Sequence, residues 1–159
     1  TSYVTDELSY DRFYPNAQNI YRINSDIHFG GANLHMPLSS DMAGQLMKKD
    51  YPQVENYTRI CTNNSNRLIK KNNDYIDENK TANVDSTFFD VFRLPAIEGD
   101  VKHALDEPNT VVITASTAKK YFGSTNVLGK TIEVKGDKNP FYKITRVIKD
   151  RTEDSHFHL

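Results

Sequence analysis

The chain has 159 residues, 37% of them hydrophobic, a formal net charge of −1 and a single cysteine, Cys61. This length is enough to bury the core of one domain, whereas one cysteine excludes an intramolecular disulfide and an all-cysteine metal site. The basic residues are dispersed, which argues against nucleic-acid binding, and no run of about 18 apolar residues or signal-peptide pattern occurs, so we expect a soluble domain.

The start of the chain predicts a short helix followed by a strand. Residues 6–16 fit the helix, with Asp6 as its cap and Pro15-Asn16 as its end. Four apolar side chains lie at helical spacing within it: Leu8, Tyr10, Phe13 and Tyr14. Residues 20–29 alternate between apolar and polar side chains, which predicts a half-buried strand. The apolar face of that strand would hold Tyr21, Ile23, Ile27 and Phe29.

Residues 41–49 predict a second helix, which Ser39 or Ser40 can cap. Three of its side chains are expected to point inward: Met42, Leu46 and Met47. Gly44 is expected to weaken the middle of this helix, because glycine is a poor helix former. A strand is expected near residues 57–62.

The middle of the chain predicts a hairpin and a brief helix. Asn72-Asn73 lies between residues 67–71 and 74–77, which predicts two strands joined by a tight turn. Val84 ends another short strand, and Asp85 is the expected cap of a helix with three phenylalanines: Phe88, Phe89 and Phe92. Aromatic residues at this spacing are more typical of a core than of an exposed docking patch.

The last part of the chain predicts a strand, a helix and two strands. Pro95 and Gly99 bracket an extended piece, and residues 101–105 predict one helical turn. A strand over residues 110–113 precedes a helix over 115–122, for which Thr114 is the expected cap and Gly123 the expected end. Two further strands are expected at about 130–135 and 141–149. The whole outline is a mixed α+β domain.

One candidate metal site occurs in the sequence. His156 and His158 would face the same way on a strand, so both could bind one metal ion. The third ligand would come from one of three residues elsewhere: His28, His35 or Asp154. A histidine-rich chain end explains the pair more simply, and no phosphate-loop motif is present. We therefore expect a binding or interaction module with no cofactor, no metal and no enzymatic activity.

Five stretches of the sequence resemble one family in the same order along the chain. They are DELSYDRFYPNAQNIYRI (residues 6–23), DSTFFDVFRLPAIEGD (85–100), ALDEPNTVVITASTAKKYFG (104–123), LGK (128–130) and YKITRVIKDRTEDSHFHL (142–159). Together they resemble the MacB/FtsX-like ABC transporter permeases, in which the first stretch follows the first transmembrane helix. Two positions depart from the pattern, because Arg146 stands where the family usually has glycine and Thr152 where it usually has proline. We expect Arg146 to alter only the local strand geometry.

The resemblance implies a location and an architecture. The domain would face the periplasm between the first and second transmembrane helices of an inner-membrane permease. It would have two lobes, a β-α-β lobe at about residues 1–62 and a smaller mixed lobe inserted at about 63–149. Residues 150–159 would return to the first lobe, and because the family's extracytoplasmic region continues further, we expect the chain to be truncated at Leu159.

The resemblance also implies a role without catalysis. The domain would couple cytoplasmic ATP hydrolysis to periplasmic export or to activation of a partner. Its partners would be its own transmembrane helices, the cytoplasmic ATPase, a second permease subunit and a periplasmic adaptor. Five residues near the start of the chain are candidates for coupling or packing: Tyr10, Asp11, Phe13, Tyr21 and Arg22.

Two alternatives to this role remain open. A ligand-binding sensor for a small molecule or peptide would need a concave apolar pocket with a few polar groups. A metal-dependent hydrolase would need to use His156 and His158.

Overall fold

A computed structural model describes residues 17–23, 25–29, 32–36, 39–62, 66–94, 96–99 and 103–150. The predicted helix at residues 6–16 and the predicted return segment at 151–159 lie outside these ranges. The described residues form helices and a mixed sheet, so the predicted α+β class is confirmed. None of the helices in the described ranges is long and apolar enough to cross a membrane.

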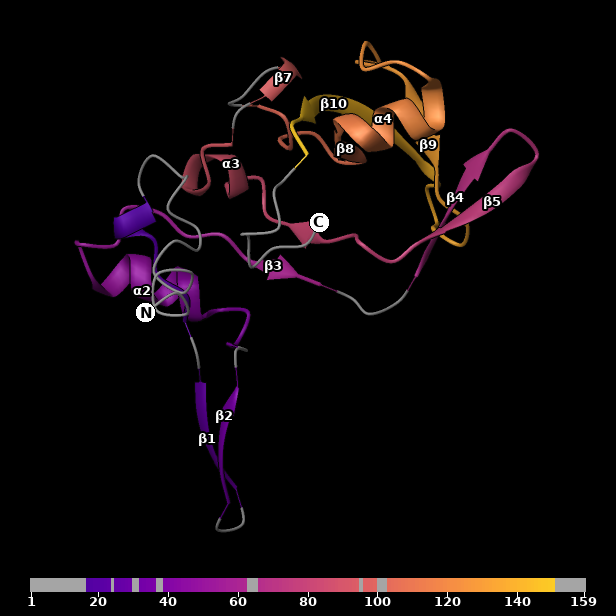
Figure 1. The fold of residues 1–159 in the computed structure, drawn as a ribbon. Helices are drawn as coiled ribbons and strands as arrows, with labels where there is room; N and C mark the ends of the chain where they lie inside the picture. The colour runs from indigo at the N-terminus through magenta and orange to yellow at the C-terminus, as the bar shows by residue number, and fades with distance from the viewer. Residues whose placement is uncertain are drawn as a thin grey trace, which may run out of the picture.

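The described chain is built of short strands with a few short helices between them (Figure 1). The first part holds η1 (Ala17–Asn19), β1 (Ser25–Phe29), β2 (Ala32–Met36), α2 (Ala43–Asp50) and β3 (Ile60–Cys61). The middle holds β4 (Arg67–Lys71), β5 (Asp74–Glu78), β6 (Asn83–Val84), α3 (Phe88–Val91) and β7 (Ala96–Gly99). The last part holds β8 (Thr110–Thr114), α4 (Ala115–Phe122), β9 (Thr131–Glu133) and β10 (Phe141–Ile148).

The central strand of the main sheet is β10. It pairs in parallel with β8 on one side and antiparallel with β7 and β9. Because β8 and β10 are parallel, the chain crosses between them through α4, which forms a β-α-β unit. This unit lies at residues 110–148, whereas β1 and β2 form a separate antiparallel hairpin. The division of the chain into lobes stays a prediction.

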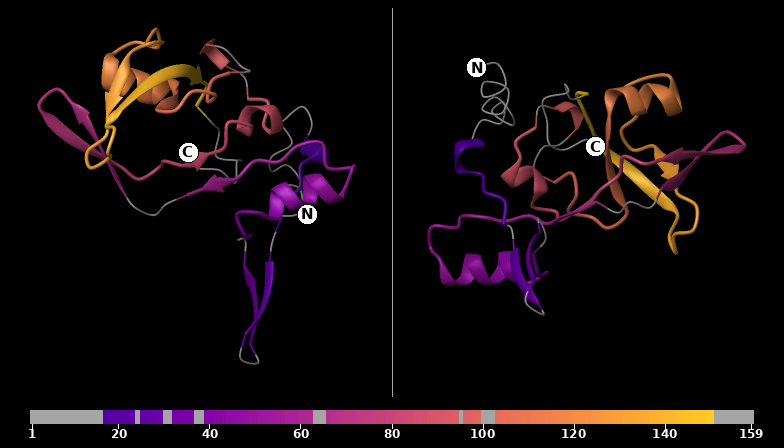
Figure 2. Two further views of the ribbon diagram at one scale, coloured as in Figure 1. Left: turned by 180° about the vertical axis from the view of Figure 1, so that it is seen from behind. Right: turned by 60° about the horizontal axis from the view of Figure 1, so that its bottom comes forward.

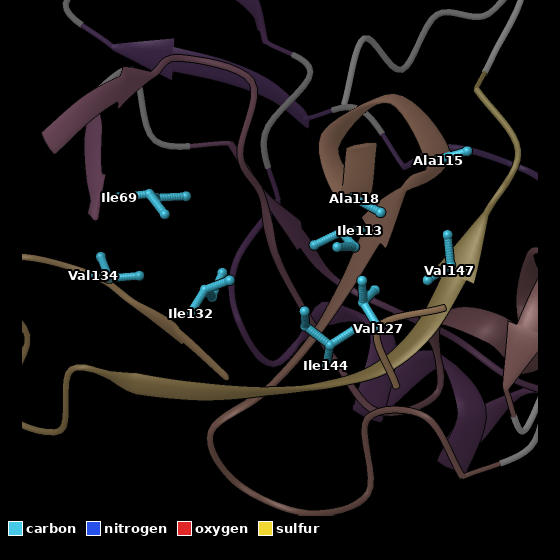
Figure 3. Packing of buried hydrophobic residues seen from close by; sticks show 9 residues of the cluster. All are labelled: Ile69, Ile113, Ala115, Ala118, Val127, Ile132, Val134, Ile144 and Val147. Carbon is cyan, nitrogen blue, oxygen red and sulfur yellow. The ribbon is translucent and has the colours of Figure 1, made fainter. Parts of the chain in front are cut away.

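A cluster of buried aliphatic side chains joins α4 to this sheet (Figure 3). Its members come from β4, β8, α4, β9, β10 and the loops beside them: Ile69, Ile113, Ala115, Ala118, Val127, Ile132, Val134, Ile144 and Val147. Thr114 caps α4 by accepting a hydrogen bond from the backbone N–H of Thr117, and Gly123 ends the helix with φ of 70°. Both cap predictions are therefore confirmed.

A second buried cluster surrounds α3. Phe88, Phe89 and Phe92 have exposed fractions of 3%, 6% and 7%, so the prediction that they belong to the core is confirmed. The rings of Phe88 and Phe89 meet edge to face with centroids 5.1 Å apart. Ala17 and Ile20 pack against this cluster, which attaches the start of the described chain to α3.

Two hairpins extend away from the sheet in different directions (Figures 1 and 2). The β4–β5 hairpin has the predicted turn, in which Asn72 adopts a left-handed φ of 57° that asparagine tolerates well. The β1–β2 hairpin pairs Phe29 with Ala32 at its tip end. The strand predicted over residues 20–29 is shorter than expected, because it begins at Ser25, and within the described ranges its partner is β2.

Several local predictions are wrong. Met42, Leu46 and Met47 were expected to point inward from α2, but they are 57%, 46% and 37% exposed, and Gly44 is the buried residue of this helix. Thr87, rather than Asp85, stands at the N-cap of α3, and its side chain makes no cap hydrogen bond. Of the helical turn expected at residues 101–105, residues 101–102 lie outside the described ranges, and the rest are a bend at residue 103 and a turn at 104–105.

Candidate functional site

The residues expected to couple the domain to the membrane do not form a common site among the described residues. Tyr10, Asp11 and Phe13 lie outside the described ranges. Tyr21 is 83% exposed and Arg22 is also exposed, in a segment without regular secondary structure. Among the described residues Tyr21 belongs to neither buried cluster, since it lies before β1, which begins at Ser25.

Tyr57 joins α2 to the segment before α3. The ring of Tyr57 lies against the backbone of Gly44, so that a Cβ atom added at Gly44 would lie less than 3.0 Å from two ring carbons. The carbonyl oxygen of Tyr57 accepts a hydrogen bond of 2.7 Å from the hydroxyl of Thr87. Glycine at position 44 therefore permits a close approach, rather than only weakening the helix as the sequence suggested.

Arg59 and Asp85 hold the same region together through two kinds of contact. The guanidinium of Arg59 donates to both carboxylate oxygens of Asp85, with nitrogen-to-oxygen distances from 2.8 to 3.2 Å. The backbone N–H of Arg59 donates to the same carboxylate at 2.9 Å. These hydrogen bonds lower the pKa of the Asp85 carboxyl group, so the pair stays charged at neutral pH.

Arg146 is a completely buried charged side chain between the sheet and α3. Its guanidinium carbon lies 4.5 Å from the centroid of the Phe89 ring, and its Nη2 donates to the carbonyl oxygen of Leu94. On the neighbouring strand Gly99 is its partner, and a Cβ atom there would lie 2.9 Å from the Cα atom of Arg146. The expectation that Arg146 alters only local strand geometry is wrong, because its side chain reaches α3.

The burial of Arg146 depends on residues that lie far from it in the sequence. A buried arginine needs both a partner for its charge and space for its long side chain. Gly99 makes room on β7, and Phe89 offers a ring face, but both lie more than 45 residues away along the chain. No local pattern could have brought these three residues together.

Asp150 fixes the end of β10 to the start of α4. Its carboxylate accepts hydrogen bonds from the backbone N–H of Ser116 at 3.1 and 3.2 Å and from the Ser116 hydroxyl. Burial favours the neutral acid, but the hydrogen bonds from Ser116 outweigh it and lower the pKa of Asp150. A carboxylate at this place also interacts favourably with the positive end of the helix.

The β4–β5 hairpin is attached to α4 and β9 by charged groups. Glu78 accepts hydrogen bonds from the Tyr121 hydroxyl at 2.7 Å and from the ammonium of Lys120. Burial and this hydrogen bond raise the pKa of Tyr121. The ammonium of Lys70 lies 3.1 Å from a carboxylate oxygen of Glu133. The hairpin is therefore anchored to the sheet at its side as well as through its ends.

The described residues offer little for chemistry. In these ranges no three His, Cys, Asp or Glu side chains are grouped as metal ligands, and His156 and His158 lie outside them. An open depression of about 620 Å³ is lined by polar side chains: Arg67, Asn83, Asn109, Asp137, Lys138, Asn139 and Tyr142. It does not match the concave apolar pocket that a sensor for small molecules would need.

The chain matches one family model along nearly its entire length. The model is described as the MacB-like periplasmic core domain, and it matches residues 1–158. A comparison with curated protein sequences finds no match.

Two solved structures have a similar fold. A domain of a protein from Porphyromonas gingivalis that is assigned as a permease gives a TM-score of 0.62 at 23% identity, over 77% of this chain and 51% of that chain. The periplasmic region of MacB from Actinobacillus actinomycetemcomitans gives a TM-score of 0.51 at 22% identity, over 68% of this chain and 49% of that chain. This chain therefore covers about half the length of each of the two structures.

Proposed function

This chain belongs to the MacB-like periplasmic core domain family, and we propose that it couples ATP hydrolysis in the cytoplasm to export or partner activation in the periplasm. The observation that carries the proposal is the family match over residues 1–158. The fold shared with the periplasmic region of MacB supports it. The domain faces the periplasm as part of an inner-membrane ABC transporter permease.

A mechanical role requires that the domain move as a unit when the membrane helices move. Ala17 and Ile20 at the start of the described chain pack on the cluster around α3. Arg146 links that cluster to β10, and Asp150 links the end of β10 to α4. A displacement that enters near Ala17 is thus passed through packed side chains to the sheet, as rigid-body coupling needs.

The partners in this role are the rest of the permease and its assembly. The domain's own transmembrane helices and the cytoplasmic ATPase supply the movement. A second permease subunit and a periplasmic adaptor are the expected neighbours on the periplasmic side. The domain itself is non-catalytic in this proposal.

The test replaces Tyr10 and Phe13 with alanine in the full-length permease and measures transport-dependent growth of a strain that lacks the chromosomal copy. We expect growth to fail, because these side chains would no longer transmit movement from the first transmembrane helix. Phe141→Ala is the matched control, since it also removes an aromatic ring, but from a position that is 54% exposed.

Cys61 shows in the same cells whether the domain is in place. Its thiol is free and exposed, so a membrane-impermeant maleimide added to spheroplasts should label it, and Cys61→Ser gives the background. Normal growth of the Tyr10/Phe13 variant with Cys61 labelled as in wild type would refute the coupling role. Labelling only after lysis would refute the periplasmic location.

A further inference from the structure

The outer side of strand β5, which we call the β5 edge, has no strand beside it among the described residues. The other strand of the hairpin, β4, has neighbours on both sides. It pairs with β5 on one side, and on the other the backbone N–H of Lys135 donates to the carbonyl oxygen of Leu68 at 2.8 Å. Pairing of Ile69 with Val134 extends that second contact. The hairpin projects away from the main sheet in every view (Figures 1 and 2).

The turn of the hairpin determines which backbone groups lie along the β5 edge. Lys71 and Asp74 flank a two-residue turn, so they form a hydrogen-bonded pair, and every second pair beyond them does the same. The N–H and C=O groups of Tyr75 and Asp77 therefore point away from β4. Leu68, the partner of Asp77, agrees with this pattern, because its carbonyl oxygen accepts from the side opposite β5. The described residues supply no hydrogen-bond partner for these four outward groups.

Contacts with α4 and with the end of β9 hold β5 in position. The hydroxyl of Tyr75 donates to a carboxylate oxygen of Glu133 at 3.2 Å, and the ammonium of Lys135 lies 5.2 Å from the centroid of the Tyr75 ring. At the last residue of β5, the carboxylate of Glu78 accepts a hydrogen bond from Lys120. A strand that is already ordered loses little conformational entropy when another strand pairs with it, so the β5 edge is a preorganised template.

The charges on β5 decide which kind of strand fits beside it. Asp74 and Asp77 are exposed, and no cationic side chain of the described residues forms an ion pair with either of them. A second copy of β5 would bring acidic side chains against acidic side chains, which is destabilising. Because the two aspartates are three positions apart, they lie on opposite faces of the strand. A complementary strand therefore carries basic side chains three positions apart.

We propose that the β5 edge binds an extended, basic segment of a partner protein as an added antiparallel strand. The backbone of that segment hydrogen-bonds to Tyr75 and Asp77, and two of its lysine or arginine side chains lie opposite Asp77 and Asp74. In strand addition of this kind, main-chain hydrogen bonds give the affinity and the side chains give the specificity. The inference names a binding surface and does not depend on the coupling of transport.

The test measures photo-cross-linking of synthetic peptides to the full-length permease in detergent. The probe is the end-capped peptide Thr-Lys-Val-Thr-Lys-Thr with a benzophenone at its C-terminus, and its lysines fall opposite Asp77 and Asp74 when its valine lies opposite Ile76. One control peptide has glutamate in place of both lysines. The other has N-methyl groups on the first lysine and the middle threonine, which removes the two donors that face β5 and keeps the charge. We expect the probe to reach half-maximal cross-linking at a concentration at least about tenfold lower than either control.

Variants of the permease separate the charge of the β5 edge from its backbone. Asp74→Lys combined with Asp77→Lys should reverse the preference, so that the glutamate peptide cross-links at the lower concentration. Asp77→Pro removes an outward N–H without removing a hydrogen bond to β4, and should weaken cross-linking of the probe more than Asp77→Asn, which loses the same charge. The N-methylated peptide makes the same comparison if Asp77→Pro does not fold.

Three outcomes overturn the proposal, and the expected reversal of preference together with the N-methyl effect supports it. Absence of cross-linking by the probe at concentrations up to about 1 mM means that the acidic residues only protect the β5 edge. Equal half-maximal concentrations for the probe and the N-methylated peptide mean charge attraction without strand pairing. Cross-linking that appears only after permease subunits are dissociated by dilution assigns the edge to a second copy of the chain. No transport is measured, so failure of the coupling role leaves these results unchanged.

Discussion

The contact between Gly44 and Tyr57 predicts that the effect of Gly44→Ala on the free energy of unfolding changes sign when the Tyr57 ring is removed. In an exposed helix, replacing glycine with alanine stabilises the fold by up to about 1 kcal/mol, because alanine has the better helix propensity. At position 44 the new methyl group would lie less than 3.0 Å from two carbons of the Tyr57 ring. Either the ring or the helix must then move.

The expected size follows from these two opposing effects. Overpacking a well-filled contact costs typically about 1–3 kcal/mol, which exceeds the propensity gain, so Gly44→Ala should lower the free energy of unfolding by up to about 2 kcal/mol. In a Tyr57→Ala background the ring is absent and the clash disappears. There the same Gly44→Ala change should raise the free energy of unfolding by up to about 1 kcal/mol.

Urea unfolding followed by circular dichroism on the four variants of this cycle measures the coupling directly. Gln45→Ala and Gln45→Gly give the propensity effect at a neighbouring exposed position of the same helix. A Gly44→Ala effect of the same sign and size in both Tyr57 backgrounds would falsify the close approach that the structure describes.

Two further predictions concern contacts with β10 and the residue that follows it. Asp150→Ala should destabilise the fold by about 0.5–2 kcal/mol at pH 7, as loss of a helix cap does. Because the pKa of Asp150 is lowered on folding, its contribution is present above about pH 4 and lost as the pH falls further, so urea unfolding of wild type and variant should converge in acid. Arg146→Ala should lower the free energy of unfolding by about 2–5 kcal/mol, while Arg146→Met, which retains most of the volume, should cost less. Equal losses for the two Arg146 variants would show that side-chain volume contributes little.

Much of the architecture was predictable because it depends on neighbours close in sequence. Asn72 takes the left-handed conformation that the β4–β5 turn needs, and Thr114 and Gly123 cap the two ends of α4. The spacing of Phe88 and Phe89 indicated a core position, and both are buried. For the turn and the caps, the residues that decide the structure lie within about four positions of one another, and for the phenylalanines the helical spacing alone indicates burial, although the residues that cover them, such as Ala104 and Ile148, come from elsewhere in the chain.

The predictions that failed depend on partners far away in the chain. Asp85 was expected to cap α3, but its carboxylate accepts hydrogen bonds from Arg59, which lies 26 residues earlier in the chain. Tyr21 lies on no strand, because no described strand pairs with its segment. Gly44 was expected only to weaken α2, but the ring of Tyr57 packs against its backbone.

The family, the α+β class and the positions of most strands and helices can therefore be read from the amino-acid sequence, since they depend on motif order and short-range periodicity. The packed side of α2, the partner of Asp85 and the position of the Arg146 side chain follow from contacts between distant parts of the chain. The physical reason is that burial and charge pairing depend on what arrives from elsewhere in the fold. An apolar side chain such as Leu46 is inward or outward only relative to a neighbour, and the side chain alone does not specify that neighbour.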